Sequence, residues 1–221
     1  MTAKSSYRSA RASTGHASRT VPSTVWACGP HGIDPADRWP AAVLSRAVRE
    51  FSAPGDRVLL IGWPAAARRG PLQAIPAGTG PALAAVEALG RRPRIESGTT
   101  GHADSHATAA LVVVSLLADE DEGPGPGPVT DLAAQRVAEG GLLVVLSRCR
   151  HSRSGVLDDP AGAVVAAGQA ADLLYLQHII AAPVTGTTVV TPQPDAPARS
   201  AHVLAHTDVF VFLNPRSAEP C

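Results

Sequence analysis

The sequence is poor in aromatic residues and in cysteine. Its 221 residues include three Trp, two Tyr and three Phe, although hydrophobic residues make up 45% of the chain. A core of this composition has to be built mainly from Ala, Val, Leu and Ile. The three cysteines, Cys28, Cys149 and Cys221, lie far apart, and their surroundings contain no CxxC or Cys/His spacing typical of zinc sites. We therefore expect no metal centre and a reducing compartment.

The sequence also lacks an excess of charge of one sign and any long hydrophobic run. Nineteen basic residues balance nineteen acidic ones, so no overall field attracts the chain to nucleic acid or to an anionic membrane. No apolar run reaches the roughly 18 residues needed to span a bilayer, and the first residues lack the apolar core of a secretory signal. These absences predict a cytoplasmic protein without a membrane partner.

The chain divides into three regions. Residues 1–24 contain basic residues but no acidic one and show no apolar period, which predicts a disordered tail; contact with nucleic acid and a transit-like role are the alternatives. Residues 25–214 are long enough for one α/β domain, since domains usually have about 100–200 residues. Residues 215–221 form a C-terminal tail.

Apolar runs alternate with helical patterns along the domain. Strands are predicted at 57–63, 92–97, 109–117, 140–147 and 172–180, and the alternating segment 202–214 predicts a last or edge strand. Helices are predicted around 41–51, 81–90, 130–140 and 160–171, with Pro54-Gly55 and Gly90 as stop signals. The segment DEDEGPGPGPVT (119–130) is expected to be a loop. This order predicts an α/β fold with a doubly wound, mostly parallel, Rossmann-like sheet.

Several of these segments, taken together and in order, resemble a known enzyme family. They are FSAPGDRVLL (51–60), AGTGPALAAVEALGRRPRIE (77–96), ALVVVSLL (110–117) and RVAEGGLLVVLSR (136–148). The resemblance is to S-adenosylmethionine-dependent methyltransferases, in particular the bacterial DNA amino-methyltransferases that modify adenine N6 or cytosine N4. It covers about residues 25–214.

The resemblance implies a binding site for S-adenosyl-L-methionine. Gly78 and Gly80 would form the turn that lets the backbone approach the cofactor, Glu96 would bind the ribose hydroxyls, and Asp104 or His102 would lie near the adenine ring. Glu96 follows Gly80 by sixteen residues, close to the roughly 20 expected when one helix intervenes. The same residues also suit a plain turn and a solvated strand end.

The sequence departs from the family before these glycines. Residues 64–76 are additional, and their role as a lid or a surface bulge is open. An alternative alignment makes IGWPAAARRG (61–70) the turn, but this stretch is bulky and contains Pro64, which has no backbone N–H to donate.

The catalytic position also departs from the family. Where the family has Asp, Asn or Ser followed by Pro-Pro and an aromatic residue, this chain has Ser115-Leu116-Leu117-Ala118. Ser115 would orient an acceptor, but no ring remains to stack on a flipped base. Four acidic residues at 119–122 would repel phosphate. The resemblance therefore predicts a degenerate motif and no standard DNA methylation.

Basic residues gather in SRCRHSRSG (147–155). Arg148, Arg150 and Arg153 follow a predicted strand and could contact nucleic acid, while a solvated loop is the alternative because no aromatic residue accompanies them. The flanking arginines would lower the pKa of Cys149, although no local base identifies a nucleophile. His178, His202 and His206 are expected to be packed or surface histidines.

Three hypotheses follow. The first is a methyltransferase with an altered acceptor, and the second is a catalytically silent binding or regulatory module on a methyltransferase fold. The third is an unrelated nucleotide-binding α/β protein, which would need a third glycine or a Lys-Ser/Thr pair that GTGPALAA (78–85) does not contain.

Overall fold

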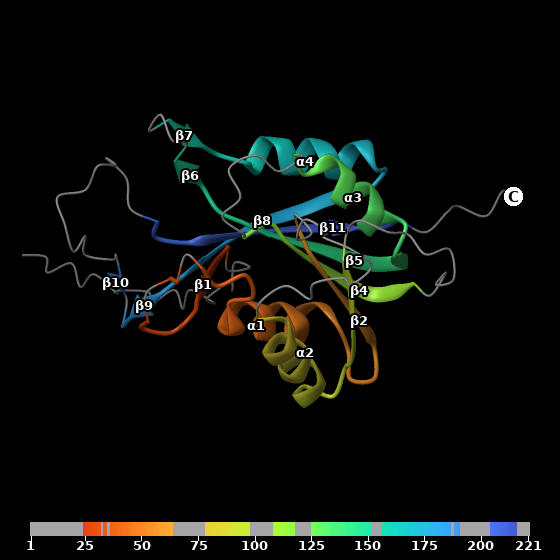
Figure 1. Ribbon diagram of the computed structural model, residues 1–221, viewed down its shortest axis with the longest axis horizontal. Coiled ribbons are helices and arrows are strands. Elements are labelled where there is room, and N and C mark those ends of the chain that lie inside the picture. The colour runs from red at the N-terminus through yellow and green to blue at the C-terminus, as the bar shows by residue number, and fades with distance from the viewer. Residues whose placement is uncertain are drawn as a thin grey trace, which may run out of the picture.

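A seven-stranded sheet with two helices on each face forms the body of the protein (Figure 1). The computed structural model describes residues 24–31, 33–34, 36–63, 78–97, 108–117, 125–151, 156–186, 188–190 and 204–215. The strands of the large sheet are β1 (Val25–Ala27), β2 (Arg57–Gly62), β3 (Arg92–Ser97), β4 (Ala109–Ser115), β5 (Val137–Ser147), β8 (Leu174–Ala182) and β11 (Thr207–Leu213). The helices are α1 (Ala41–Phe51), α2 (Thr79–Ala88), α3 (Gly127–Ala134) and α4 (Ala161–Ala170). Two small hairpins pair β6 (Arg150–His151) with β7 (Leu157–Asp158) and β9 (Val184–Thr185) with β10 (Thr188–Val189).

The strand order is β1-β8-β11-β5-β4-β2-β3. Neighbouring strands are parallel except at β11, which runs antiparallel to both β5 and β8. This arrangement confirms the predicted doubly wound, mostly parallel sheet. Of the two alternatives for 202–214, the last strand of the chain is confirmed and the edge strand is wrong, because β11 lies inside the sheet. Its residues Thr207–Phe212 are all buried, so the strand is covered on both faces.

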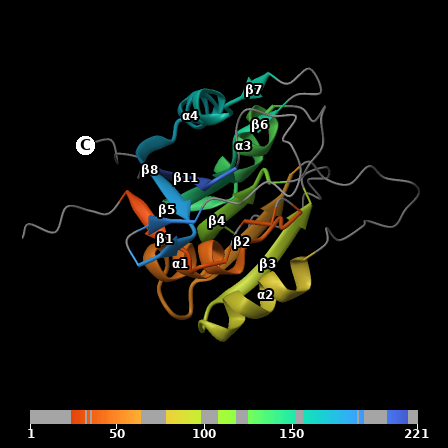
Figure 2. The same cartoon turned by 90° about the vertical axis from the view of Figure 1, so that its left-hand side faces the viewer.

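Helices α1 and α2 cover one face (Figures 1 and 2). Helix α1 buries Val43, Leu44, Ala47 and Val48, the helical stripe that the sequence predicts, against alternate residues of the strands. Helix α2 begins two residues before Pro81, the predicted start, and ends with Gly90 at φ 77°, a conformation that favours glycine. The 3.6-residue period therefore predicts α1 correctly, and the Pro81 and Gly90 signals predict α2.

Helices α3 and α4 cover the opposite face, where Val112, Val114, Phe210 and Phe212 pack against them. Helix α4 approaches the sheet at Gly168, because a Cβ built on this glycine would lie 2.3 Å from Cε1 of Phe212. The bulk of Phe212 therefore fills the space that a side chain at position 168 would need.

Two boundaries differ from the sequence predictions. Helix α3 includes Gly127–Thr130, which were expected in a loop, because Pro128 is tolerated in the first turn where its missing N–H has no helical acceptor. The helix ends at Ala134, and β5 begins at Val137 rather than at 140. The short strand β1 was not predicted. Across the segments that the structure describes, no helix is long and apolar enough to cross a membrane.

Candidate functional site

The carboxyl ends of β2 and β4 form the switch point of the parallel sheet. From β2 the chain passes through α2 to β3 on one side, and from β4 it passes through α3 to β5 on the other side. The backbone N–H of Trp63 after β2 donates to the carbonyl of Ser115 at the end of β4 (2.9 Å), so the two strand ends are adjacent. Ligands of open α/β sheets bind outside this point, which makes it the candidate site.

Gly78 starts helix α2 at this edge. It has φ 77° and occupies the position before the helix, while Gly80 lies in the first turn. No side chain makes a capping hydrogen bond to the first amide groups of the helix. The positive φ explains why a glycine is needed at position 78, because other residues adopt it at a cost.

Trp39 lies against this glycine turn. Its Cδ1 atom would be 3.9 Å from a Cβ at position 78, and the side chain belongs to the core under α1 and α2. The adjacent indole Nε1–H is buried and has no acceptor within the described part of the chain. An unsatisfied buried donor costs about 1–3 kcal/mol, so this N–H is well suited to an acceptor atom supplied by a ligand. Sequence reasoning missed Trp39, since nothing local links it to a turn some forty residues later.

Ser115 lies at the end of β4 and is fully buried. Its hydroxyl donates to the carbonyl of Arg38 (2.6 Å) and accepts from the backbone N–H of Leu117 (3.4 Å). In this structure Ser115 therefore anchors residues 36–40, which we call the crossing segment, over the end of β4.

Arg148, the first residue after β5, also binds the chain around the crossing segment. Only 3% of this residue is exposed, and its guanidinium donates to the carbonyls of Asp34 (3.4 Å), Asp37 (3.0 Å) and Leu117 (3.2 Å). Arg150 donates to the carbonyl of Leu116. Arg153 lies outside the described residues. Nucleic-acid contact through these arginines thus stays a prediction, with two of the three side chains engaged by backbone carbonyls.

Glu96 is bound by Arg136 in a two-pronged ion pair. Nε and Nη2 of Arg136 donate to the two carboxylate oxygens at 2.9 and 3.0 Å, and both side chains are largely buried. Glu96 stands opposite Ile61 in the parallel register, and Ile61 packs on the α3 and α4 face. The carboxylate therefore points to that face, away from Gly78 and α2. Asp104 and His102, the residues expected near an adenine ring, lie outside the described residues, as does the insertion at 64–76.

The structure gives surroundings for Cys149 and for two histidines that the sequence did not predict in full. Burial raises the pKa of the Cys149 thiol, and the nearby Asp159 and Asp208 carboxylates raise it further, so the predicted lowering by Arg148 and Arg150 is wrong. Nε2 of His178 and Nε2 of His206 both contact Oδ1 of Asp208, at 2.7 and 3.3 Å. These histidines are packed, as expected, but against a nearly buried carboxylate that sequence reasoning did not identify.

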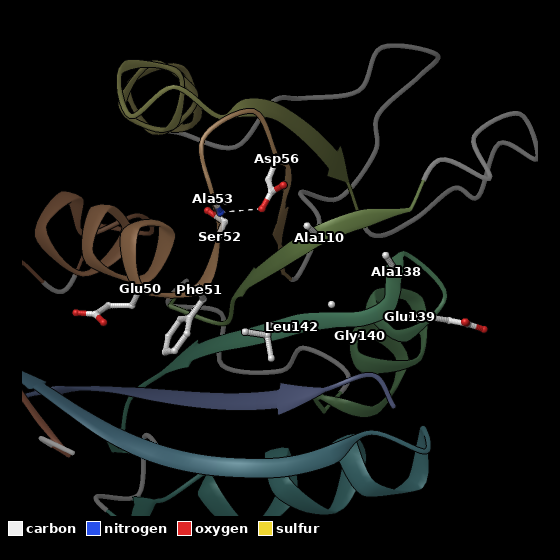
Figure 3. Close-up of a pocket in the computed structure, with 11 residues that line it drawn as sticks. Glu50, Phe51, Ser52, Ala53, Asp56, Ala110, Ala138, Glu139, Gly140 and Leu142 are labelled. Atoms are coloured by element: carbon white, nitrogen blue, oxygen red, sulfur yellow. Dashed lines mark hydrogen bonds between the residues drawn. The ribbon is translucent and has the colours of Figure 1, made fainter. Parts of the chain in front are cut away.

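A groove of about 420 Å³ lies at the opposite, amino edge of the sheet (Figure 3). Phe51 and Leu142 face each other across it, while the carboxylates of Glu50 and Glu139 point outward at its two ends. The amino edge is not where parallel α/β sheets bind their ligands, so we do not assign the cofactor site to this groove.

Comparison with known proteins identifies the fold. No family model matches the sequence, and no curated protein matches it. A chain from the complex of the Haloferax volcanii Trm112 methyltransferase activator with a methyltransferase is similar in structure, with a TM-score of 0.53 and 11% identity over 83% of this chain and 92% of that one. The N-methyltransferase NodS from Bradyrhizobium japonicum WM9 matches with a TM-score of 0.45 and 14% identity over 80% and 94% of the two chains. At this level of identity the first of these two likenesses shows the fold alone, a Rossmann-like, mostly parallel sheet covered by helices on both faces.

Proposed function

We propose that the protein is an S-adenosylmethionine-dependent methyltransferase with its cofactor site at the carboxyl ends of β2 and β4. The observation that supports this most is the buried indole N–H of Trp39, which lacks an acceptor among the described residues and lies beside the Gly78 turn. A cofactor bound there would supply oxygen or nitrogen acceptors for this donor. The residues present fit such a group, since a glycine turn, the start of helix α2 and an aromatic edge meet at the switch point.

Each predicted cofactor residue has a definite role in this proposal. Gly78 and Gly80 allow close approach of the cofactor to the start of α2, and Asp104 is proposed to lie near the adenine. Glu96 would bind the ribose hydroxyls, which requires that its carboxylate leave the Arg136 guanidinium and turn from the α3 and α4 face toward Gly78. When bound, the cofactor supplies an electrophilic methyl group, and the protein contributes proximity and alignment.

The acceptor class is a separate question. The relationship to DNA N6-adenine and N4-cytosine methyltransferases rests on the sequence resemblance, with the motif Ser115-Leu116-Leu117-Ala118 in place of the family's pattern. For Ser115 to orient an exocyclic amine, its hydroxyl would have to release the Arg38 carbonyl. We therefore propose an acceptor other than a base in DNA.

The second candidate is a catalytically silent binding module on the same fold. The ion pair of Glu96 favours it, because the carboxylate predicted to bind ribose is already neutralised within the protein. The two candidates differ in whether the cofactor binds and whether its methyl group is transferred.

Calorimetric titration of the full chain with S-adenosylmethionine tests the proposal. We expect binding that Trp39→Phe weakens about tenfold, the loss of one hydrogen bond to a polar ligand atom. Trp26→Phe is the matched control, because Trp26 is equally buried but stacks on Phe51 away from the glycine turn. Glu96→Ala should weaken binding if the carboxylate reaches the ribose, whereas Arg136→Ala should not.

The alternative outcomes separate the candidates. Absence of binding heat from a protein with a normal unfolding transition contradicts the methyltransferase proposal. Binding without methyl transfer to any amine, nucleic acid or protein acceptor supports the silent module.

A further inference from the structure

The two outer strands of the large sheet are protected against pairing to different degrees. β3 closes one side and carries Arg92, Pro93 and Arg94, and charged residues and proline are what natural proteins use to keep an edge strand from pairing. β1 closes the other side, but it pairs only with Ile180–Ala182 of β8. Among the strands that the structure describes, none pairs with the outer side of Leu174–His178, which we call the β8 edge.

The β8 edge is apolar and contains no Lys, Arg, Asp or Glu. Leu174 and Leu176 are each about half exposed, and Tyr175 is 38% exposed although its ring packs on Phe212. Leu176 also has no register partner on β11, where the pairing shifts by one residue. An exposed strand of this composition offers its backbone groups to another strand, so the β8 edge is suited to pairing.

Helix α4 lies beside this edge and is equally free of charge (Figure 2). It packs on β8 and β11, and its buried residues are Val164 and Gly168. Its exposed residues are Gly162, Ala163, Ala166, Gln169 and Ala170. The solvent face of a surface helix normally carries charged residues, so this helix adds a second uncharged surface next to the β8 edge.

The N-terminal residues of the same chain do not suit the β8 edge. β1 runs parallel to β8, and the backbone groups of Thr24 and Cys28 bond to β8, at 2.7 Å from Ile180 N to Thr24 O and at 2.9 Å from Cys28 N to Ala182 O. Alternate residues of a strand bond to the same neighbour, so a longer β1 would next need the N–H of residue 22. Residue 22 is Pro, which has none to donate.

A second copy of the chain covers both surfaces through one two-fold axis. Antiparallel pairing of two β8 edges places the two β8 strands about 4.8 Å apart. Because α4 packs over both β8 and β11, its axis lies about half a strand spacing inside β8, so the two α4 helices are about two spacings, or roughly 9.6 Å, apart. Helices pack at about 8–10 Å, and the small residues of α4 permit this approach.

Charge and area agree with a second copy. In a two-fold interface the same patch meets itself, and a patch without charged residues does so without repulsion. A standard interface takes about 800 Å² from each partner, at roughly 30–40 Å² per residue. The β8 edge and the exposed face of α4 together supply about half of this area, which fits a reversible dimer and not a permanent one.

We propose that the β8 edge and α4 form the interface of a symmetric dimer, in which Leu174–His178 of the two copies pair in antiparallel orientation. Sedimentation equilibrium of the full chain in reducing buffer tests this. We expect a monomer–dimer equilibrium with a Kd on the order of 1–100 µM. Hydrogen exchange of the wild type locates the interface, because the amides of 174–178 should exchange more slowly as the protein concentration rises through the Kd.

A charge on the edge should separate the two copies. Leu176→Lys introduces the residue type that blocks edge pairing, and it should weaken dimerisation at least about tenfold. Leu157→Lys is the matched control, because Leu157 is a similarly exposed leucine on β7, at the carboxyl edge of the sheet. It should leave the Kd unchanged, and urea unfolding checks that both variants are folded.

Four results would overturn the inference. The first is a monomer at concentrations well above the expected Kd, and the second is a dimer that folded Leu176→Lys leaves unchanged. The third is an assembly that grows beyond two copies, because a two-fold interface closes at the dimer. The fourth is a monomer in which 174–178 already exchange slowly, because another segment of the same chain then covers the β8 edge. If Leu176→Lys does not fold, the concentration dependence of exchange in the wild type decides.

Discussion

Gly168 shows how a single residue sets the distance between a helix and the sheet. An alanine Cβ there would lie 2.3 Å from Cε1 of Phe212, whose ring is fully buried and cannot withdraw. We expect Gly168→Ala to destabilise the protein by about 1–3 kcal/mol, the usual cost of overpacking a core. Gly162→Ala in the same helix is the matched control, because nothing lies within 4 Å of its Cβ. That change should be neutral or stabilise by up to about 1 kcal/mol. Urea unfolding of both variants measures the difference, and equal stabilities would contradict the packing argument.

Residue roles were only partly predictable from the sequence. Gly78 was identified because a glycine before a helix start is a local signal, and the structure gives it a positive φ. Whether it binds a cofactor is untested. The partners of Glu96 and Ser115 were not predictable, because Arg136 is forty residues from Glu96 and Arg38 is seventy-seven from Ser115. Such pairs depend on the strand order, which no local pattern encodes.

At the scale of elements, one of the bonds that hold the crossing segment 36–40 is made by Ser115. Ser115→Ala removes the donor to the Arg38 carbonyl and should cost about 1–2 kcal/mol. We also expect faster amide exchange in residues 36–40, measured by hydrogen exchange and mass spectrometry.

Ser52→Ala is the control for this experiment. Its hydroxyl donates to the carbonyl of Val48 at the same 2.6 Å, but at the amino edge of the sheet. It should destabilise the protein without changing exchange in 36–40. Equal exchange in the two variants would show that Ser115 does not anchor the segment.

The major elements were predictable where the apolar period is strong. The stripe of α1 and the buried run of β2 were both confirmed, since each depends on neighbours in sequence. The start of β5 was missed because Val137–Gly141 carry Ala, Glu and Gly in place of an apolar run. The β-bulge opposite Ala109 and Leu111 accommodates these residues. β11 was predicted as a last or an edge strand; it is the last strand, but its place inside the sheet was not predictable, because pairing partners depend on the whole sheet.

At the scale of the whole molecule, the contacts of Asp208 link β11 to β8 and to the chain that precedes β11. The hydrogen bond to Asp208 raises the pKa of His206 above its ordinary value of 6.5, helped by the charges of Asp208 and Asp159 and opposed by burial. His178 faces the same carboxylate. A raised pKa in the folded state means that protonated His206 stabilises the fold. This stabilisation is fully present below pH 6.5 and is lost as the pH rises through the folded pKa.

We therefore expect the free energy of unfolding to fall as the pH rises from 6.5 through the raised folded-state pKa of His206, and the fall to be smaller in His206→Gln. Urea unfolding across this range measures it. Asp208→Asn removes the cause of the shift and should flatten the profile in the same way. A profile that is identical in the wild type and in His206→Gln would contradict the assignment.

The position of β11 has a consequence for how the protein is made. Among the described strands, β8 pairs with β1 on one side and β11 on the other, so β1 and β8 join the rest of the sheet only after residues 207–213 have left the ribosome. Until then the edges of β5 and β8 stay open, and such unpaired strand edges are where nascent chains aggregate. We therefore expect the nascent chain to be most prone to aggregate before the antiparallel strand β11 pairs with β5 and β8.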